Sequence, residues 1–398
     1  MAKNLEVQFL AVVRLNRGSL PMRTPPWSLI VLAALVLSAL GQTNPPPRTA
    51  LPAVTTSPEI HADRRVTFRV KAGQANDVTV GGQGISGKVA LTRGENGEWS
   101  TTVGPMEPGV YEYSFTLDGV QMIDPSNAAI KPQRQPRTSI LHIPGDPPLV
   151  WDFQDVPHGV VHQHGYQSKT LGALRQFYVF TPPGYEKNAT TKYPVLYLIH
   201  GFGDNHATWT QHGKAHWILD NLIALKKARP MVVVMPDGHP VAPGSGPRDQ
   251  YGIRNSQALE KEIMEEMLPI VESAYRVKAD ASSRAIAGLS MGGGHSLHTG
   301  FSHLDQFAWI GAFSAGVPGQ DRMGEMFSNP EAANQHLKLL WIACGKSDFL
   351  IERNRQLVAL LTEKGIHHTW IETEGDHSWP VWRRYLADFA PLLFTETK

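Results

Sequence analysis

The sequence predicts an α/β fold, in which a mostly parallel sheet is covered by helices on both faces, preceded by a small all-β domain. Two observations predict it. Beyond Arg175, apolar runs of strand length alternate with segments of helical length, which is typical of parallel sheets. Between residues 61 and 145, short runs rich in β-branched and aromatic residues are separated by Gly, Pro and Asn, as in antiparallel strands joined by tight turns. We therefore expect two domains, residues 61–145 and residues 146–398.

The composition indicates a folded protein. The chain has 398 residues, of which 41% are hydrophobic and 18% charged, and its formal net charge is +1. It is too apolar and too weakly charged to be largely disordered. Its single cysteine, Cys344, excludes an internal disulfide and any CxxC site. Because no cluster of Lys and Arg marks a surface for nucleic acid or an anionic membrane, neither is an expected partner, and the oligomeric state is left open.

The first 60 residues predict export. Residues 27–40 read WSLIVLAALVLSAL, which fits the apolar core of a signal peptide and is short for a membrane span. Ala39 and Gly41 provide the small residues that a signal peptidase reads, so we expect residues 1–42 to be removed and the protein to be secreted or periplasmic. Residues 43–60 are rich in Pro and Thr and are expected to form an extended linker. An uncleaved membrane anchor is the alternative.

Seven apolar runs are the expected strands of the α/β domain. Each ends in or near a turn residue, and the segments between them have helical length. The most regular helical pattern covers residues 258–275, where apolar residues recur at helical spacing against an acidic face. The expected strands are residues 175–182, 193–201, 230–238, 283–290, 308–316, 338–345 and 367–375.

Ser290 is the predicted nucleophile. Residues 288–292 read Gly-Leu-Ser-Met-Gly, directly after an expected strand and directly before a segment that can begin a helix. In such a sharp turn the serine adopts a strained backbone conformation, and Gly288 and Gly292 leave room for neighbouring backbone. The hydroxyl is then exposed at the carboxyl edge of the sheet, beside the free N–H groups of the new helix. The sequence thus predicts a nucleophile elbow.

The expected partners of Ser290 are Asp348 and His377. A hydroxyl needs a base to remove its proton, and the base needs a carboxylate to orient it. Asp348 follows the expected strand at 338–345, and His377 lies in a loop before the last helical segment, so the three residues occur in the order Ser, acid, His. Asp376 is the competing acid, but the side chains of sequence neighbours usually point apart.

Two backbone N–H groups are needed to bind the oxyanion of a tetrahedral intermediate. Met291 follows the nucleophile and is expected to supply one of them. The turn after the strand at 193–201 is expected to supply the other, from Phe202 or alternatively from Gly201, since glycines there let the backbone approach a substrate. An ordinary glycine turn is the alternative.

Two further groups of residues have competing explanations. Trp209 and the loop at 240–256 are candidates for the wall of a substrate pocket, with core packing and a plain surface loop as their respective alternatives. His158, His162 and His164 have ligand-like spacing. A catalytic zinc would also need a carboxylate or a further histidine in a known geometry, and a serine triad needs no metal. No metal or cofactor is therefore expected.

The chain resembles carbohydrate esterase family one, the feruloyl and acetyl-xylan esterases, and more distantly the enterochelin esterases. The resemblance covers roughly residues 150–395 and is carried by FYVFTPPGYE, YPVLYLIHGFGDNHATW, PMVVVMPDGH, RAIAGLSMGGGHS and GDHSWPVWR. It implies an α/β-hydrolase fold with the triad and oxyanion donors given above. One departure is that the helix before the elbow usually opens with an aromatic residue in these enzymes, whereas here RNSQALEKE does so without one.

Residues 61–145 resemble the immunoglobulin-like domain found ahead of such esterases, which is related to family 48 carbohydrate-binding modules. The resemblance implies a serine carboxylesterase that hydrolyses feruloyl or acetyl esters on plant cell-wall xylan through an acyl-enzyme. The alternatives are an enterochelin-type siderophore esterase and a non-catalytic carbohydrate-binding protein on a hydrolase scaffold. The β domain is expected to fix the catalytic domain or to wall its cleft.

Overall fold

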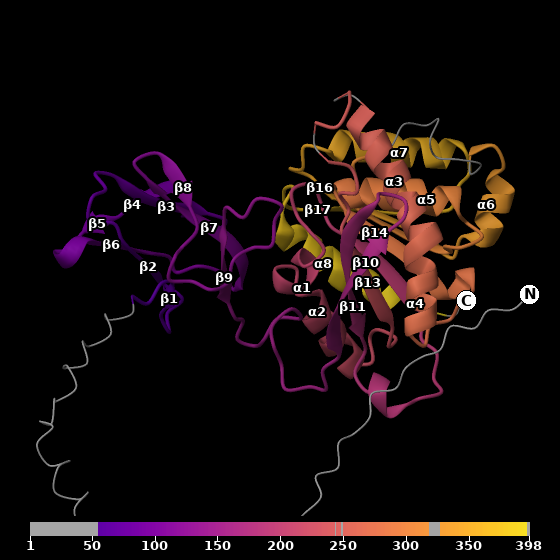
Figure 1. The fold of residues 1–398 in the computed structure, drawn as a ribbon, viewed down its shortest axis with the longest axis horizontal. Coiled ribbons are helices and arrows are strands. Elements are labelled where there is room, and N and C mark those ends of the chain that lie inside the picture. The colour runs from indigo at the N-terminus through magenta and orange to yellow at the C-terminus, as the bar shows by residue number, and fades with distance from the viewer. Residues whose placement is uncertain (1–54, 243, 248–249, 318–326, 396–398) are drawn as a thin grey trace, which may run out of the picture. The chain divides into compact units, whose positions relative to one another are not determined.

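The computed structural model describes residues 55–395 except 243, 248–249 and 318–326 (Figure 1). The predicted signal peptide, residues 1–42, lies outside the described residues, as does the predicted linker up to residue 54. Ordered structure begins before the expected start at His61, because Glu59–Ile60 forms strand β1 at the edge of a sheet. No helix in the described ranges is long and apolar enough to cross a membrane.

Two antiparallel sheets, called here the N-terminal sheets, contain strands β1 to β9. Besides β1 these strands are β2 Val66–Lys71, β3 Val78–Gly82, β4 Lys88–Ala90, β5 Thr92–Arg93, β6 Glu98–Val103, β7 Gly109–Leu117, β8 Val120–Met122 and β9 Ser139–Ile143. One sheet has the order β1-β2-β6-β5, and the other has the order β4-β3-β7-β8 with β9 paired to β7. A shared core with contacting rings at Phe68 of β2 and at Tyr113 and Phe115 of β7 joins the strands.

The remaining strands form one eight-stranded sheet in the order β10-β11-β13-β12-β14-β15-β16-β17. They are β10 Val160–Ser168, β11 Ala173–Thr181, β12 Val195–Ile199, β13 Val232–Pro236, β14 Arg284–Leu289, β15 Trp309–Phe313, β16 Leu339–Gly345 and β17 Thr369–Thr373. Neighbouring strands are parallel except at β10 and β11. All seven expected strands are confirmed. Strand β10 was not predicted, because its sequence, VVHQHGYQS, has no apolar face.

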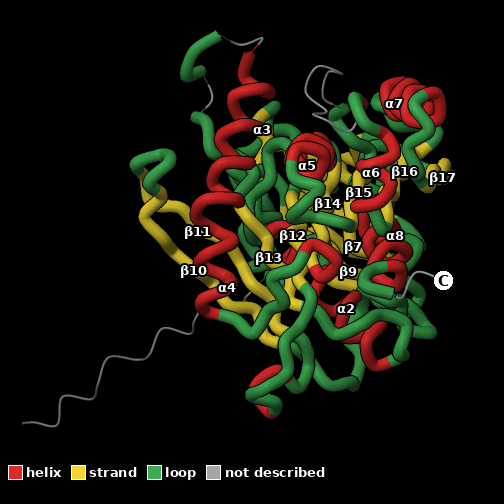
Figure 2. The backbone as a smooth tube through the Cα atoms, turned by 90° about the vertical axis from the view of Figure 1, so that its right-hand side faces the viewer, coloured by secondary structure: helices red, strands yellow, loops and turns green. Residues whose placement is uncertain are grey.

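Helices connect the strands and cover the sheet. They are α1 Thr208–Gln211, α2 Ala215–Ala224, α3 Tyr251–Glu262, α4 Leu268–Ala274, α5 Met291–Ser302, α6 Pro330–His336, α7 Ile351–Glu363 and α8 Trp379–Phe389. A π-helical turn, Ile263–Met267, joins α3 to α4. Figure 2 shows α3, α4 and α5 in front of the strands of the sheet.

The helix expected at 258–275 begins earlier, at Tyr251. Its first two turns contain Gly252 and Ser256 and bury only Asn255, so they lack the apolar stripe from which the helix was predicted. The helix therefore does open with an aromatic residue, Tyr251. The departure from the esterase pattern that we inferred from the sequence is wrong, because we placed the start of the helix too late.

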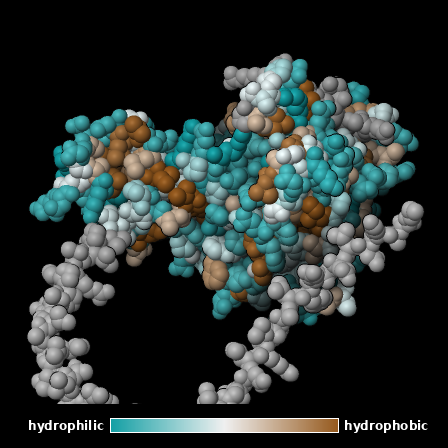
Figure 3. Space-filling model, in the orientation of Figure 1, coloured by the Kyte–Doolittle hydropathy of each residue, from teal (hydrophilic) through white to brown (hydrophobic). Residues whose placement is uncertain are grey.

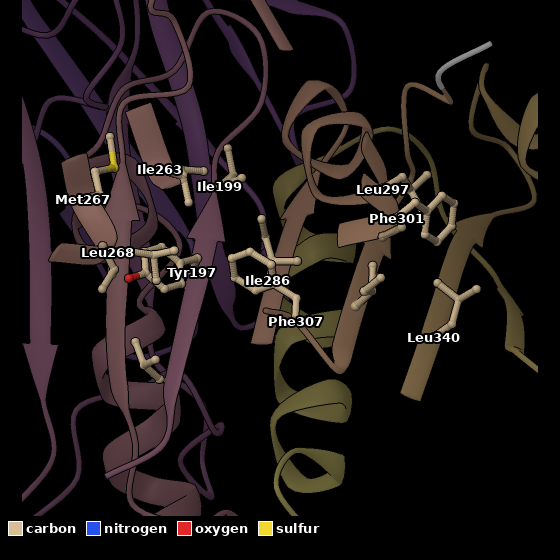
Figure 4. Packing of buried hydrophobic residues seen from close by; sticks show 14 of the residues in the cluster. Tyr197, Ile199, Ile263, Met267, Leu268, Ile286, Leu297, Phe301, Phe307 and Leu340 are labelled. Carbon is tan, nitrogen blue, oxygen red and sulfur yellow. The ribbon is translucent and has the colours of Figure 1, made fainter. Parts of the chain in front are cut away.

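Apolar side chains are concentrated inside the molecule, while the face shown in Figure 3 is mainly hydrophilic with separate apolar patches. Alternation along a strand sends neighbouring side chains to opposite faces. In β12, Tyr197 and Ile199 join the core under α5 and the π-helical turn, where Leu297 and Ile263 pack (Figure 4). Leu198 faces the other core, which is shared with α2 and α8. Each fully buried apolar side chain contributes about 1.5–3 kcal/mol, so both faces hold the sheet in place.

Candidate active site

Ser290 lies between β14 and α5 on a strained turn. Its φ and ψ angles are 52° and −115°, which non-glycine residues rarely adopt. A Cβ at Gly288 would lie 2.5 Å from the carbonyl carbon of Gly292, and a Cβ at Gly292 would lie 2.4 Å from the carbonyl oxygen of Ile199. The neighbouring backbone therefore requires glycine on both sides of the serine, as the sequence predicts.

The structure brings Ser290, His377 and Asp348 together. His377 Nε2 lies 2.9 Å from Ser290 Oγ, and His377 Nδ1 lies 2.9 and 2.8 Å from the two carboxylate oxygens of Asp348. Asp376, the competing acid, instead accepts a hydrogen bond from Ser378. When Nδ1 donates to the carboxylate, Nε2 is free to accept the serine proton. The arrangement can therefore generate a serine nucleophile.

The carboxylate of Asp348 is 2% exposed. Burial raises the pKa of Asp348, but hydrogen bonds from the His377 ring and the Leu350 N–H lower it by more, so the pKa lies below its ordinary value. The Leu350 N–H donates to Oδ1 at 2.8 Å. A carboxylate that stays ionised can stabilise the positive charge that the imidazole acquires when it takes a proton.

The loop that follows β12 lies against the elbow. A Cβ at Gly201 would fall 3.5 Å from the Cβ of Ser290, so this loop approaches the serine closely. On the other side of the serine, Met291 is the first residue of α5, and its N–H therefore has no acceptor within the helix. The helix start and the loop after β12 can supply the two donors that an oxyanion needs.

His239, which follows β13, accepts a hydrogen bond from one of the amides of this loop. The Gly203 N–H donates to His239 Nε2 at 3.2 Å. Burial, together with the nearby His200 and Arg134, lowers the pKa of His239 to about 3, so the ring is neutral at pH 7 and can accept this hydrogen bond. Because the Gly203 N–H is engaged, Phe202 and its alternative Gly201 remain the candidate donors of the loop.

A cavity of about 340 Å³ opens onto Ser290 and His377. The exposed Phe202 and Phe349 stand at its edge. Its lining also includes Gln83 and Glu112, together with Lys131 and Gln133 from the segment between β8 and β9. A second cavity of about 310 Å³ also borders Phe202 and is lined by residues that include Tyr251, Asn255, Met291, His295 and Val317. The β domain was expected to fix the catalytic domain or to wall its cleft, but no sequence pattern indicated Gln83, Glu112, Lys131 or Gln133 individually, because they lie far from Ser290 along the chain.

Trp209 does not line either cavity. Its side chain is 1% exposed, and its ring packs against Trp379 and Phe313 at centroid distances of 4.9 and 6.4 Å. The expectation that Trp209 walls the substrate pocket is therefore wrong, because α1 turns the ring into the core. Trp379, which it supports, lines the cavity at Ser290. Of the loop at 240–256, the part that lines a cavity is the start of α3.

The three histidines with ligand-like spacing have separate partners. His158 pairs with Asp220 at 2.9 Å, His162 lies 3.0 Å from Thr181 Oγ1, and His164 stacks on Phe177 and contacts the hydroxyl of Tyr275. In the part of the chain that the structure describes, no group of three His, Cys, Asp or Glu residues is arranged to hold a metal ion.

Comparisons with known proteins find esterases among the similar proteins. A family model described as putative esterase matches residues 168–393. An endo-1,4-β-xylanase/feruloyl esterase of Xylanibacter ruminicola is 32% identical over 343 residues, which cover 85% of this chain and 46% of that protein. The chain thus spans about half the length of this relative.

Two solved structures are similar. A ferulic acid esterase is 28% identical with a TM-score of 0.52, over 59% of this chain and 97% of that one. The enterobactin esterase of Shigella flexneri is 18% identical with a TM-score of 0.58, over 82% of this chain and 92% of that one, a likeness of fold alone. The α/β-hydrolase fold is therefore confirmed. The chain belongs to the putative esterase family and has the resemblance to carbohydrate esterase family one that its motifs predict.

Proposed function

We propose that the protein is an exported serine esterase that cleaves feruloyl or acetyl esters on plant cell-wall xylan through an acyl-enzyme on Ser290. The observation that carries the proposal is the unbroken set of hydrogen bonds from Ser290 through His377 to Asp348. It occurs at a strained turn where the serine hydroxyl is the group presented to the cavity. Such strain is retained where function requires it.

The proposed mechanism has two steps. His377 Nε2 takes the hydroxyl proton while Ser290 Oγ attacks the ester carbonyl, and the N–H groups of Phe202 and Met291 bind the resulting oxyanion. When the intermediate collapses, His377 returns the proton to the leaving alcohol and the acyl group remains on Ser290. Water, deprotonated by the same imidazole, then releases the acid and restores the serine. Asp348 stabilises the imidazolium in both steps.

We assign the acyl group to the second cavity and the alcohol to the first. The second cavity is lined by Tyr251, Ile253 and Val317, among others, which suits an aromatic or short acyl chain. The first cavity is bounded by polar side chains such as Gln83 and Gln133, which suit the hydroxyl groups of a sugar. The xylanase/feruloyl esterase relative supports the choice of a xylan-linked ester.

The proposal also covers the N-terminal part of the chain. We take residues 1–42 as a signal peptide, residues 61–145 as an immunoglobulin-like domain and residues 146–398 as the catalytic domain. The two antiparallel sheets around one core support the second assignment. The apolar run at 27–40 supports export.

A panel of substrates tests the proposal. Purified protein is assayed on methyl ferulate, acetylated xylan and enterochelin, beside the Ser290→Ala variant. We expect turnover of the first or second substrate, and a fall in kcat of about 10⁶ in the variant. Preferred turnover of enterochelin would identify the siderophore alternative. Absence of turnover, together with failure of an active-site serine probe to label the protein, would favour the non-catalytic alternative.

A further inference from the structure

Two buried charges and one half-buried charge join the N-terminal sheets to the loop that carries the candidate oxyanion donor. Lys131 Nζ lies 2.9 Å from Glu112 Oε1 and 3.0 Å from Asp204 Oδ1. The side chains of Lys131, Glu112 and Asp204 are only 7%, 15% and 5% exposed. Glu112 lies in β7, and Asp204 ends the loop that begins at Gly201. One cation therefore connects two parts of the chain beside Ser290.

The backbone near Lys131 pairs with the same loop. The Arg134 N–H donates to the carbonyl of Gly203 at 2.8 Å, and Gln133 forms an antiparallel bridge with Asp204. Residues 131–134 thus lie along the loop as a short extended segment. These main-chain contacts hold the backbone of Asp204, and Lys131 holds its carboxylate.

Asp204 in turn closes the turn that presents Phe202. Its N–H donates to the carbonyl of Gly201 at 3.3 Å, so Gly201 and Asp204 bracket the two residues between them. A displacement of Asp204 therefore changes the direction of the Phe202 N–H. Because the strength of a hydrogen bond falls steeply with misalignment, a small rotation is enough to weaken the oxyanion site.

We propose that Lys131 is a positioning residue for the oxyanion hole: by neutralising the buried Asp204, it fixes the loop so that the Phe202 N–H points to where negative charge develops. The inference rests on the proposed serine mechanism and deepens it. It makes Lys131, a residue of the segment between β8 and β9 of the N-terminal sheets, necessary for the rate of the chemical step, although this residue does not touch the reacting atoms.

Without Lys131 the carboxylate of Asp204 loses its cation in a site shielded from water. Burial raises the pKa of Asp204, and the charge of Lys131 opposes that rise. An unpaired buried carboxylate either takes a proton or moves toward solvent, and both changes alter the turn. The Lys131 ammonium also lies 5.8 Å from the ring centroid of Trp379, which lines the cavity.

The first test is Lys131→Met, which keeps most of the side-chain length and removes the charge. With methyl ferulate, which carries no sugar to contact the cavity beside Lys131, we expect kcat to fall about 10- to 100-fold, as for a misplaced oxyanion donor, while KM changes little. The inactivation rate by a p-nitrophenyl alkylphosphonate, whose adduct carries a tetrahedral oxyanion, should fall in parallel. Inhibition by ferulate, which forms no such adduct, should be unchanged. A wild-type kcat, or a rise in KM alone, would overturn the inference.

Asp204→Asn breaks the same link from the loop side and is the second test, which also decides the question if Lys131→Met does not fold. We expect a similar fall in kcat. In the double variant, kcat should be no lower than in the less active of the two single variants, because each substitution removes the same interaction. Losses that multiply would show that Lys131 does not act through Asp204, and would contradict the inference.

Arg284→Gln is the matched control. It removes another buried cation, whose partner Glu272 lies at 2.7 Å, at the amino end of β14 and far from Ser290. It should lower the melting temperature and leave kcat unchanged, and an equal fall in kcat would assign the Lys131 effect to lost stability. Ser290→Ala separates this inference from the proposed function. If that variant stays active, the mechanism itself fails, whereas an inactive Ser290→Ala with a fully active Lys131→Met refutes only the positioning role.

Discussion

Gly292→Ala tests whether the elbow and the loop after β12 are packed as tightly as the structure has them. The new Cβ would lie 2.4 Å from the carbonyl oxygen of Ile199 and 2.5 Å from that of His200. Ordinary contact begins at 3.4 Å, so backbone on one side must move by about 1 Å, a displacement that can lower a rate by about 10². We expect kcat to fall about 100-fold, and the melting temperature to fall by several degrees because overpacking costs about 1–3 kcal/mol.

The assay is steady-state hydrolysis of methyl ferulate or p-nitrophenyl acetate, with the melting temperature measured on the same samples. Gly165→Ala is the control, because a Cβ there would meet only Leu174 Cδ1, at 3.9 Å. If Gly292→Ala keeps wild-type kcat while remaining folded, the elbow is not clamped by backbone, and the explanation for its two glycines is wrong.

Three further outcomes follow from the structure. Asp348→Asn should lower kcat by about 10⁴, because the imidazole then loses its orienting carboxylate. A kcat close to the wild-type value in steady-state kinetics would contradict this role. Burial lowers the pKa of both His239 and His295 to about 3. Since these rings take up protons only on unfolding, stability should fall between pH 7 and pH 5, by about 1.4 kcal/mol per histidine for each pH unit below the ordinary pKa. A urea midpoint that does not move over this range would contradict that. Trp209→Ala should lower the free energy of unfolding by about 3–5 kcal/mol. A change in KM without a loss of stability would instead indicate that Trp209 contacts the substrate.

Local sequence patterns predicted the parts of the structure that depend on neighbours along the chain. Apolar runs identified seven strands, and the Gly-Leu-Ser-Met-Gly turn together with the residue order selected Ser290, Asp348 and His377. The structure places these three side chains within hydrogen-bond distance. Their catalytic roles stay a prediction.

What was missed depends on packing between distant segments. The local sequence around Trp209 fits a core position and a pocket wall equally well. Only the direction in which α1 points the side chain decides between them. The link between Lys131 and Asp204 spans 73 positions in the sequence and has no periodic pattern. Tyr251 was passed over because the first turns of α3 bury too little apolar surface to show a helical stripe.

The central claim is that Ser290 carries the acyl group during turnover. Mass spectrometry of the protein, quenched within milliseconds of mixing with an activated ester, tests it most directly. We predict a mass increase equal to one acyl group on the peptide that contains Ser290, absent in Ser290→Ala and lost on continued incubation in water. An acyl group on a different residue, or full turnover by Ser290→Ala, would contradict the account.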